Sequence, residues 1–371
     1  MKKRVGMAVL VLLLACSWAQ AQKNVIKLGQ NVSRGVARAT EQQILKSVPA
    51  RTLTLYGPEL RALVASNRLS ASSFPKLSRR NDLLTHQAVN LFVAQEKLFL
   101  EQAPLLVEKI ESRVYNRVPY AELLPKDTEV LYIGEIHGVP RVQQEIVTLV
   151  KSLRTVYPGR NIYLAAEGVP AAFDLDYSTD DLIHTQEALL ERLHEAADLA
   201  DMEIREIVAS SSVVIAAVEA GIPVLGLESE GALCRLATPK GRKMPTEEEY
   251  EQVVTSLVGM EFRNRGFAKG IKVLREADPE ALIVVYGGID HLAYHQLSSV
   301  PALVGGKSFV VQVTVPAALA ESNLLFRHFK EPEDIRRAFK ASPDAKLAEY
   351  WKEPTSFNQL LGNDLTVIVH E

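Results

Sequence analysis

The chain has 371 residues, of which 47% are hydrophobic and 23% are charged, as in an ordinary folded protein. Its 42 Lys and Arg residues nearly balance 45 Asp and Glu residues, so the sequence offers no basic footprint and we expect no nucleic-acid partner. Two cysteines are too few for a disulfide scaffold or a thiolate zinc cluster. Any chemistry must therefore use oxygen and imidazole groups. At about 150 residues per domain, the length predicts two domains or one large α/β domain with extensions.

The N-terminus is typical of an exported protein. Cationic residues 1–4 precede an apolar run at residues 5–15, which is too short to cross a hydrocarbon core of about 30 Å. Cleavage after Ala21 makes residues 1–21 a signal peptide, whereas the alternative lipobox at residues 13–16 makes Cys16 a lipidated N-terminus. We expect an extracytoplasmic protein, either periplasmic or secreted, which contacts a membrane only if Cys16 is lipidated.

Residues 22–118 predict a helical N-terminal extension. Apolar residues between Leu84 and Leu106 recur with helical spacing and predict one long helix, bent or interrupted near Pro104. Ser, Pro and basic residues at 70–80 predict a loop. We connect no residue pattern of this extension with chemistry, and we expect it to act as a cap or spacer.

Residues 119–316 have the pattern of an α/β domain. Short apolar runs occur at residues 130–133, 162–165, 223–227, 282–286 and 309–313. Continuous rather than alternating apolarity indicates strands that are covered on both faces, as in a parallel sheet. Helical segments are expected between these runs, one that begins at Pro140 and a helical hairpin at 181–220. A further long helix is expected after Thr246 and Glu249, because these two residues have the spacing of a capping box.

This alternation predicts a doubly wound α/β fold, with a mainly parallel sheet and helices on both faces. Residues 317–371 predict a C-terminal extension packed on this domain. We expect a helix near residues 332–352 and a last strand at residues 365–369.

Charged residues follow the predicted strands at the edge where such sheets bind ligands. Charged side chains seldom lie at the edge of a core unless they are paired or liganded. We therefore predict a site at the strand ends, formed by Glu135, His137, Glu167 and His291, with Glu228 as a weaker member.

Arg263 is a further candidate, on the long helix. It shares a helical stripe with Phe267 and Ile271, which directs its guanidinium towards the sheet. There it would bind the carboxylates or a substrate oxyanion, while the alternative is a side chain that extends to solvent. Gly134 and Gly288 each precede a histidine by three residues, and we expect them where a strand turns sharply or a substrate approaches the backbone.

The other histidines and Cys234 are weaker candidates. His295 follows His291 by four residues, so the two histidines share one face if that segment is a helix. They would then form a His-x-x-x-His pair that binds a metal. We expect Cys234 to be structural. Surface roles are expected for the remaining histidines, which are His86, His184, His194, His328 and His370.

The motifs Gly134-Glu-Ile-His137, Glu167, Arg263-Asn-x-x-Phe-Ala268 and Gly288-Ile-Asp-His291 together resemble a superfamily. It joins erythromycin esterases, ChaN-like haem-binding lipoproteins and TraB/Tiki proteins, and the resemblance covers roughly residues 128 to 315. Tiki-like members imply a metal-dependent protease, with His137, Glu167 and His291 as ligands. Esterase-like members imply lactone opening by Glu135, His137, Arg263 and His291. ChaN-like members imply haem binding, although we cannot place their haem-ligating tyrosine in this sequence.

These observations predict an exported ChaN/Tiki-like protein that is a metal-assisted hydrolase of an ester or peptide bond. A water activated by a cation, or by His137 or His291 as general base, would attack the carbonyl. Glu135 or Glu167 would orient the base or hold the metal, and Arg263 would stabilise negative charge. The expected metal is zinc, manganese or iron. The alternatives are a non-catalytic haem or iron binding protein and a degenerate member that only recognises a partner; the expected ligands are a small molecule, a peptide or haem.

Overall fold

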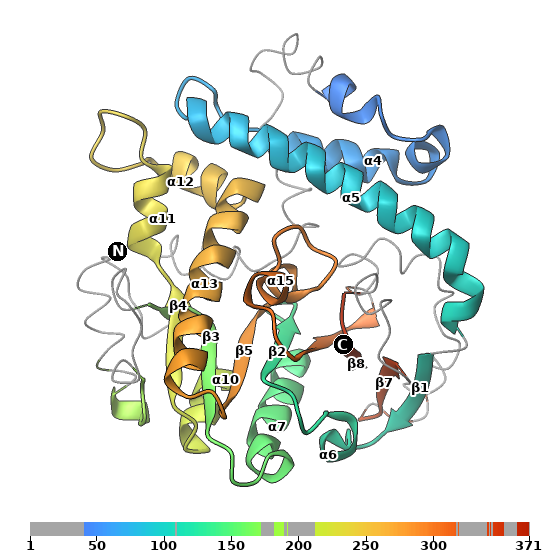
Figure 1. Ribbon diagram of the computed structural model, residues 1–371, viewed down its shortest axis with the longest axis vertical. Helices are drawn as coiled ribbons and strands as arrows, with labels where there is room; N and C mark the ends of the chain where they lie inside the picture. Colours follow the sequence, from blue (N-terminus) through green and yellow to red (C-terminus); the bar gives the residue numbers. More distant parts are fainter. Residues whose placement is uncertain are drawn as a thin grey trace.

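One eight-stranded sheet forms the centre of the protein (Figure 1). The computed structural model describes residues 41–107, 110–171, 182–188, 212–316, 344–351 and 362–370, with residues 191, 318, 340 and 342. In spatial order the strands are β1 (Ile110–Tyr115), β7 (Lys346–Trp351), β8 (Leu365–Ile368), β6 (Ser308–Thr314), β2 (Val130–Glu135), β5 (Leu282–Gly288), β3 (Ile162–Pro170) and β4 (Val224–Glu228). The predicted signal peptide and Cys16 lie outside the described residues.

The sheet is mainly parallel, as the sequence predicted. All neighbouring strands from β8 to β4 pair in parallel, and β7 pairs antiparallel with both β8 and β1. Strands β3 and β4 lie on one side of β2, and β5, which follows them in the chain, lies between β2 and β3. Strand β6 then pairs with the other side of β2. The ends of β2, β5, β3 and β4 therefore meet at one edge, which is where such folds bind ligands.

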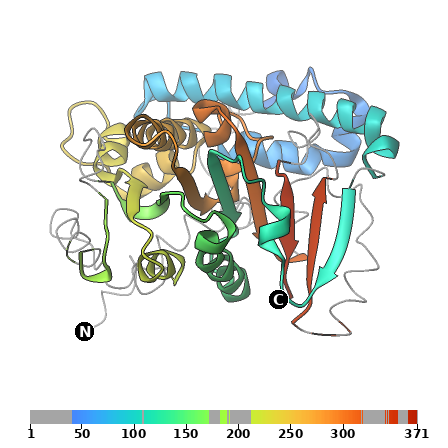
Figure 2. The ribbon, with the colours of Figure 1, turned by 60° about the horizontal axis from the view of Figure 1, so that its bottom comes forward.

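Helices cover both faces of the sheet, which confirms the α/β fold (Figure 2). Alternate side chains of β2 serve the two layers: Leu131 and Ile133 pack with α7 (Pro140–Val156) and α10 (Ser212–Glu219), whereas Val130 and Tyr132 pack with α13 (Leu257–Ala277) and α15 (Val300–Val304). The shorter helices are α6 (Tyr120–Leu123), α11 (Glu230–Ala237), α12 (Glu247–Val254) and α14 (Ile289–Leu292). Most of the helical hairpin expected at residues 181–220 lies outside the described residues.

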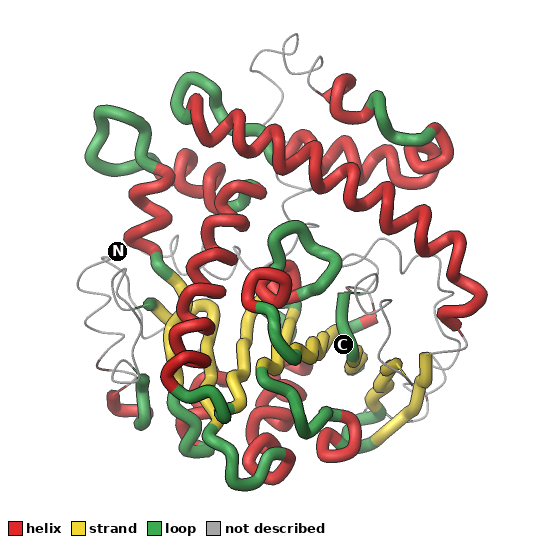
Figure 3. The backbone as a smooth tube through the Cα atoms, in the orientation of Figure 1, coloured by secondary structure: helices red, strands yellow, loops and turns green. Residues whose placement is uncertain are grey.

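The N-terminal extension contains a pair of helices, α4 (Ala50–Ser66) and α5 (Pro75–Val107), which cross one end of the molecule (Figure 3). A small apolar core that includes Tyr56, Leu60 and Val89 joins them. Within the described residues, no helix combines the length and apolarity needed to cross a membrane.

Helix α12 begins with the predicted capping box. The Thr246 hydroxyl accepts a hydrogen bond from the backbone N–H of Glu249, and the Glu249 carboxylate accepts one from the backbone N–H of Thr246. The long helix expected after this box is divided, because α12 ends at Val254 and α13 begins at Leu257 with Ser256 as its N-cap. This division gives α13 its own N-terminus, facing the extension.

Three expectations from the sequence were wrong. Residues 110–115, assigned to the helical extension, are strand β1 of the sheet. Residues 346–351, assigned to a helix, are strand β7, because burial of Leu347 and Ala348 between β1 and β8 outweighs their helix propensity. Residues 75–80 begin helix α5, with Pro75 in its first turn, and are not a loop. The same helix, expected to be bent or interrupted near Pro104, continues through that residue without interruption, and the bend stays a prediction.

Candidate functional site

The fold brings the predicted side chains together at one edge of the sheet. Glu135 ends β2, Glu167 lies within β3, and Glu228 ends β4. His137 follows β2 by two residues, and His291 lies on α14, directly after β5. Hydrogen bonds and close ion pairs connect these five residues with Arg263 of α13 in one network.

Glu135 holds His137 in a fixed orientation. The Nδ1 atom of His137 lies 2.7 Å from Oε1 of Glu135, so this nitrogen carries a proton and donates it. The buried hydroxyl of Tyr286 on β5 donates to the same oxygen over 2.6 Å. The other carboxylate oxygen, Oε2, is buried without a hydrogen-bond partner among the described residues. The Nε2 atom of a neutral His137 is therefore left as the basic atom of the ring.

Glu167 is the centre of the network. Its Oε1 accepts from Nη2 of Arg263 over 2.6 Å, and its Oε2 accepts from the backbone N–H of Gly288 over 2.7 Å. The Nε2 atoms of the two histidines face it as well, at 3.3 Å for His291 and 3.8 Å for His137. One carboxylate thus connects the ends of β3 and β5 with α13.

Arg263 points towards the sheet, and only 9% of its side chain is exposed. Besides Glu167, it binds Glu228, whose two oxygens accept from Nε over 3.1 Å and Nη2 over 2.5 Å. Its guanidinium also lies over the ring of Phe267, one turn along α13. Glu228 is therefore part of the network as the second carboxylate of Arg263.

His291 lies between two hydrogen-bond acceptors. Its Nδ1 contacts Oδ1 of Asn264, an orientation fixed because Nδ2 of Asn264 donates to the carbonyl of Ser298 over 2.9 Å. Its Nε2 faces Oε1 of Glu167. A ring with acceptors at both nitrogens satisfies both contacts only when it carries both protons. At Nε2 the two histidines differ, because Glu167 lies 3.3 Å from this atom of His291 and 3.8 Å from that of His137.

The electrostatics follow from these contacts. Burial alone would raise the pKa of Glu167, but the charges of His291 and Arg263 hold it well below the ordinary value of 4.5. Burial acts to lower the pKa of His137, yet the hydrogen bond to Glu135 and the charges of Glu167 and Glu135 outweigh it and raise that pKa above 6.5. Burial also raises the pKa of Asp290, beside His291.

The donors expected for a metal lie together but do not form a coordination shell. Both oxygens of Glu167 already accept hydrogen bonds, and the Arg263 guanidinium holds the position that a cation would take beside Oε1. Among the described residues, no group of three or more His, Cys, Asp or Glu side chains is arranged to hold a metal ion. As placed, these residues do not fit the metal that the sequence predicts at His137, Glu167 and His291, and analysis of the metal content of the purified protein tests that prediction.

The weaker candidates lie outside this network. His295 contacts Gln296, and its carbonyl accepts a hydrogen bond from Gln95 of α5. The rings of His86 and His184 are exposed, as expected. Cys234 is a partly buried free thiol whose pKa is raised by burial and by the charge of Glu230.

Two further members, Tyr286 and Asn264, were not assigned roles from the sequence. Tyr286 lies inside an apolar strand run, and only the pairing of β2 with β5 brings it beside Glu135. Asn264 stood within the Arg-Asn helix motif, and its position next to Arg263 was the one available signal.

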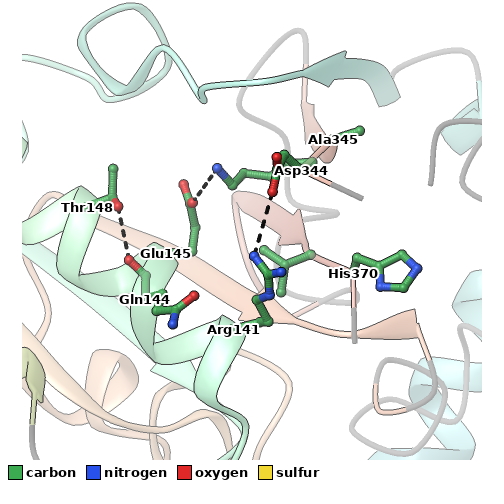
Figure 4. A pocket seen from close by; sticks show the side chains of 9 residues that line it. Arg141, Gln144, Glu145, Thr148, Asp344, Ala345 and His370 are labelled. Carbon is green, nitrogen blue, oxygen red and sulfur yellow. Dashed lines mark hydrogen bonds and ion pairs between the residues drawn. The ribbon is translucent and has the colours of Figure 1, made fainter. Parts of the chain in front are cut away.

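A separate cavity of about 190 Å³ lies between α7 and the ends of β7 and β8 (Figure 4). Its charged side chains pair with one another, Lys346 with Glu145 at 3.0 Å and Arg141 with Asp344 at 3.7 Å. No predicted site residue lines it. We therefore base the function on the network at the strand ends.

Comparison with known proteins adds little. No family model matches the chain, and no curated protein matches it. Among solved structures, the type III effector HopBA1 matches with 16% sequence identity and a TM-score of 0.31, over 51% of this chain and 78% of that chain. A similarity of this size carries no argument about function, and the resemblance to ChaN, Tiki and esterase proteins stays a prediction.

Proposed function

We propose that the chain is a hydrolase that cleaves an ester or peptide bond, with His137 as general base and His291 as proton donor. The observation that carries this proposal is the contrast between two imidazoles on either side of Glu167. His137 is oriented by a carboxylate at Nδ1, and its Nε2 lies 3.8 Å from Glu167, beyond hydrogen-bond distance, whereas His291 has an acceptor in contact with each nitrogen. In this proposal the ring held at Nδ1 alone is the base, and the ring held at both nitrogens is the proton donor.

His137 suits the part of the base. Its Nδ1–H is fixed by Glu135, as a carboxylate fixes the imidazole in many hydrolases. It is also the more exposed of the two imidazoles, with 17% of its side chain exposed against 4% for His291. A raised pKa strengthens the base once it is deprotonated.

The reaction follows from these roles. His137 Nε2 removes a proton from water as the water oxygen bonds to the carbonyl carbon, and negative charge develops on the carbonyl oxygen. His291 then donates its Nε2 proton to the leaving oxygen or nitrogen as the bond to carbon breaks. The carboxylic acid and the alcohol or amine depart, and solvent returns one proton from His137 to His291.

Arg263 and the carboxylates set the charge of the site. Arg263 offsets part of the negative charge of Glu167 and Glu228, which reduces the opposition of these carboxylates to the negative charge of the transition state. Glu167 in turn holds the donating nitrogen of His291 in place. The expected extracytoplasmic location and the small-molecule or peptide substrate stay predictions.

The test compares two leaving groups in His137→Asn and His291→Asn variants. A p-nitrophenyl ester needs no proton on its leaving group, whereas an alkyl ester of the same acid does. We expect His137→Asn to lower kcat/KM by about 100-fold or more for both esters. We expect His291→Asn to lower it strongly for the alkyl ester and weakly for the p-nitrophenyl ester.

His86→Asn is the matched control, because this exposed histidine on α5 lies outside the network. It should hydrolyse both esters like the unaltered protein. Full activity in His137→Asn, or equal losses for both esters in His291→Asn, would contradict the assignment. Fluorogenic peptides measured in the same way decide between ester and peptide substrates.

A further inference from the structure

Helix α13 carries Arg263 and Asn264, and its first turn is capped by the N-terminal extension. The first backbone N–H groups of a helix have no partner within the helix. Here the N–H of Leu257 donates to Oδ1 of Asn67 over 2.7 Å, and the N–H of Val258 donates to Oδ1 of Asn81 over 3.0 Å. Ser256 supplies the acceptor for the following residue, Gly259. Two of these three capping side chains thus come from residues about 180 positions earlier in the chain.

The two asparagines are held rigidly. Asn67 ends α4 and lies 4% exposed, with Nδ2 donating to the carbonyl of Leu63 over 2.9 Å. Asn81 on α5 is fully buried, and its Nδ2 donates to the backbone carbonyl of Asn67. Because both amide groups use their nitrogen inside the helix pair, their oxygens are directed at α13. The capping oxygens are therefore fixed by the packing of α4 on α5.

Charged and polar contacts reinforce this junction. Arg80, next to Asn81, binds both oxygens of Glu261 on α13, at 3.0 Å from Nε and 2.5 Å from Nη2. Further along α5, the side chain of Gln95 donates a hydrogen bond over 3.0 Å to the backbone carbonyl of His295, a residue that follows His291 by four positions. The extension thus contacts both segments that deliver site residues from this side.

We propose that Asn67, Arg80 and Asn81 are positioning residues for the site, so that the extension sets the placement of Arg263 and Asn264. This inference rests on the proposed hydrolase function for its effect on turnover. Arg263 lies less than two turns from the capped end of α13, and a helix transmits a shift of its first turn along its axis. A displacement of about 1 Å at reacting groups lowers turnover by up to about 100-fold. The helix pair is then part of the working site and not a spacer.

The test uses Arg80→Ala against Arg79→Ala and Asn67→Ala against Asn67→Asp. Arg79 is the exposed neighbour on the same helix, so its variant removes the same charge without touching Glu261. Aspartate at position 67 keeps an oxygen acceptor at a helix N-terminus, whereas alanine removes it. Amide hydrogen exchange over residues 257–264 and the His291 Nδ1 resonance report the position of α13 without any substrate, and ester turnover reports its effect.

We expect Arg80→Ala and Asn67→Ala to speed exchange over residues 257–264, shift the His291 resonance and lower kcat about ten-fold with little change in KM. Arg79→Ala should behave like the unaltered protein. Asn67→Asp keeps the capping oxygen but loses the Nδ2 donor to Leu63, so it should recover most, but not all, of what Asn67→Ala loses. Unchanged exchange and an unchanged His291 resonance in both alanine variants would overturn the inference. So would faster exchange with an unchanged kcat. If the unaltered protein hydrolyses no ester or peptide, the proposed function fails, and the resonance alone then decides the positioning role.

Discussion

Removal of the Arg263 guanidinium should strongly destabilise the protein. In an Arg263→Met variant, Glu167 and Glu228 lose three hydrogen bonds of 2.5 to 3.1 Å from a side chain that is 9% exposed. Loss of one partner of a buried ion pair costs about 3–5 kcal/mol, because the remaining charge stays buried. We expect a loss of this size at pH 7. Domains are stable by about 5–15 kcal/mol, so the variant should still fold.

The control is Arg265→Met, two residues along the same helix. Arg265 pairs with Glu261 at 3.0 Å, but 65% of its side chain is exposed. Exposed pairs contribute at most about 1 kcal/mol. Both variants make the same chemical change in the same helix, so the difference between them isolates the effect of burial.

The pH dependence provides the sharper test. The pKa of Glu167 is held well below 4.5, so this carboxyl contributes stability that is present above pH 4.5 and is lost as the pH falls through its folded pKa. Arg263 supplies part of that contribution. The difference between the unaltered protein and Arg263→Met should therefore be largest near pH 7 and narrow in acid. Guanidinium unfolding followed by circular dichroism at several pH values measures it. A loss of about 1 kcal/mol or less, or a difference independent of pH, would refute a buried, ionised network.

Two further predictions concern His137 and metal binding. Burial acts to lower the pKa of His137, but the hydrogen bond to Glu135 and the charges of Glu167 and Glu135 outweigh it and raise that pKa. Because the base must be deprotonated, kcat/KM should rise with pH along a limb whose midpoint lies above 6.5. In Glu135→Gln that limb should move to lower pH, and an unmoved limb would contradict the role of Glu135. For metal, we expect no stoichiometric ion in the purified protein, because Arg263 and Gly288 already bind Glu167. One equivalent of zinc, manganese or iron that is lost in His137→Ala and His291→Ala would support the sequence-based metal site instead, and a haem absorption band would support the binding-protein alternative.

The central strands could be predicted because burial on both faces leaves a continuous apolar run in the sequence. Strands β2 and β5 are buried along their whole length, and the expected runs at 130–133 and 282–286 begin where these strands begin and stop two residues before they end. The edge strand β1 carries Glu111, Ser112 and Arg113 in succession. Such a segment becomes a strand only through its pairing with β7, which no local pattern predicts.

The same difference applies to the site. Residues at strand ends were found because parallel strands place their ends at one edge, whatever the loops between them. Tyr286 was missed because its contact with Glu135 joins residues 151 positions apart, and its phenol looks like one more buried ring in an apolar run. The role of Asn264 depends on which atom of His291 it meets, and this follows only from the packing of α13 against α14.

The structure gives a different reason for the glycine in each of the two Gly-x-x-His motifs. We expected sharp turns at Gly134 and Gly288, yet neither glycine has a positive φ. What both positions require is room. A Cβ on Gly134 would overlap the side chain of Ile289, and a Cβ on Gly288 would lie 3.0 Å from Nε2 of His137.

Each glycine therefore makes room for a residue of the other motif. Strands β2 and β5 pair so that Glu135 lies opposite Gly288. Because Gly288 has no side chain, His137, which follows β2, has room to approach Glu167. Gly287 extends this space, because a Cβ there would lie 2.6 Å from Oε2 of Glu167. The two motifs act as one interlocked unit, which explains why a single Gly-x-x-His is uninformative while a pair on neighbouring parallel strands indicates a site.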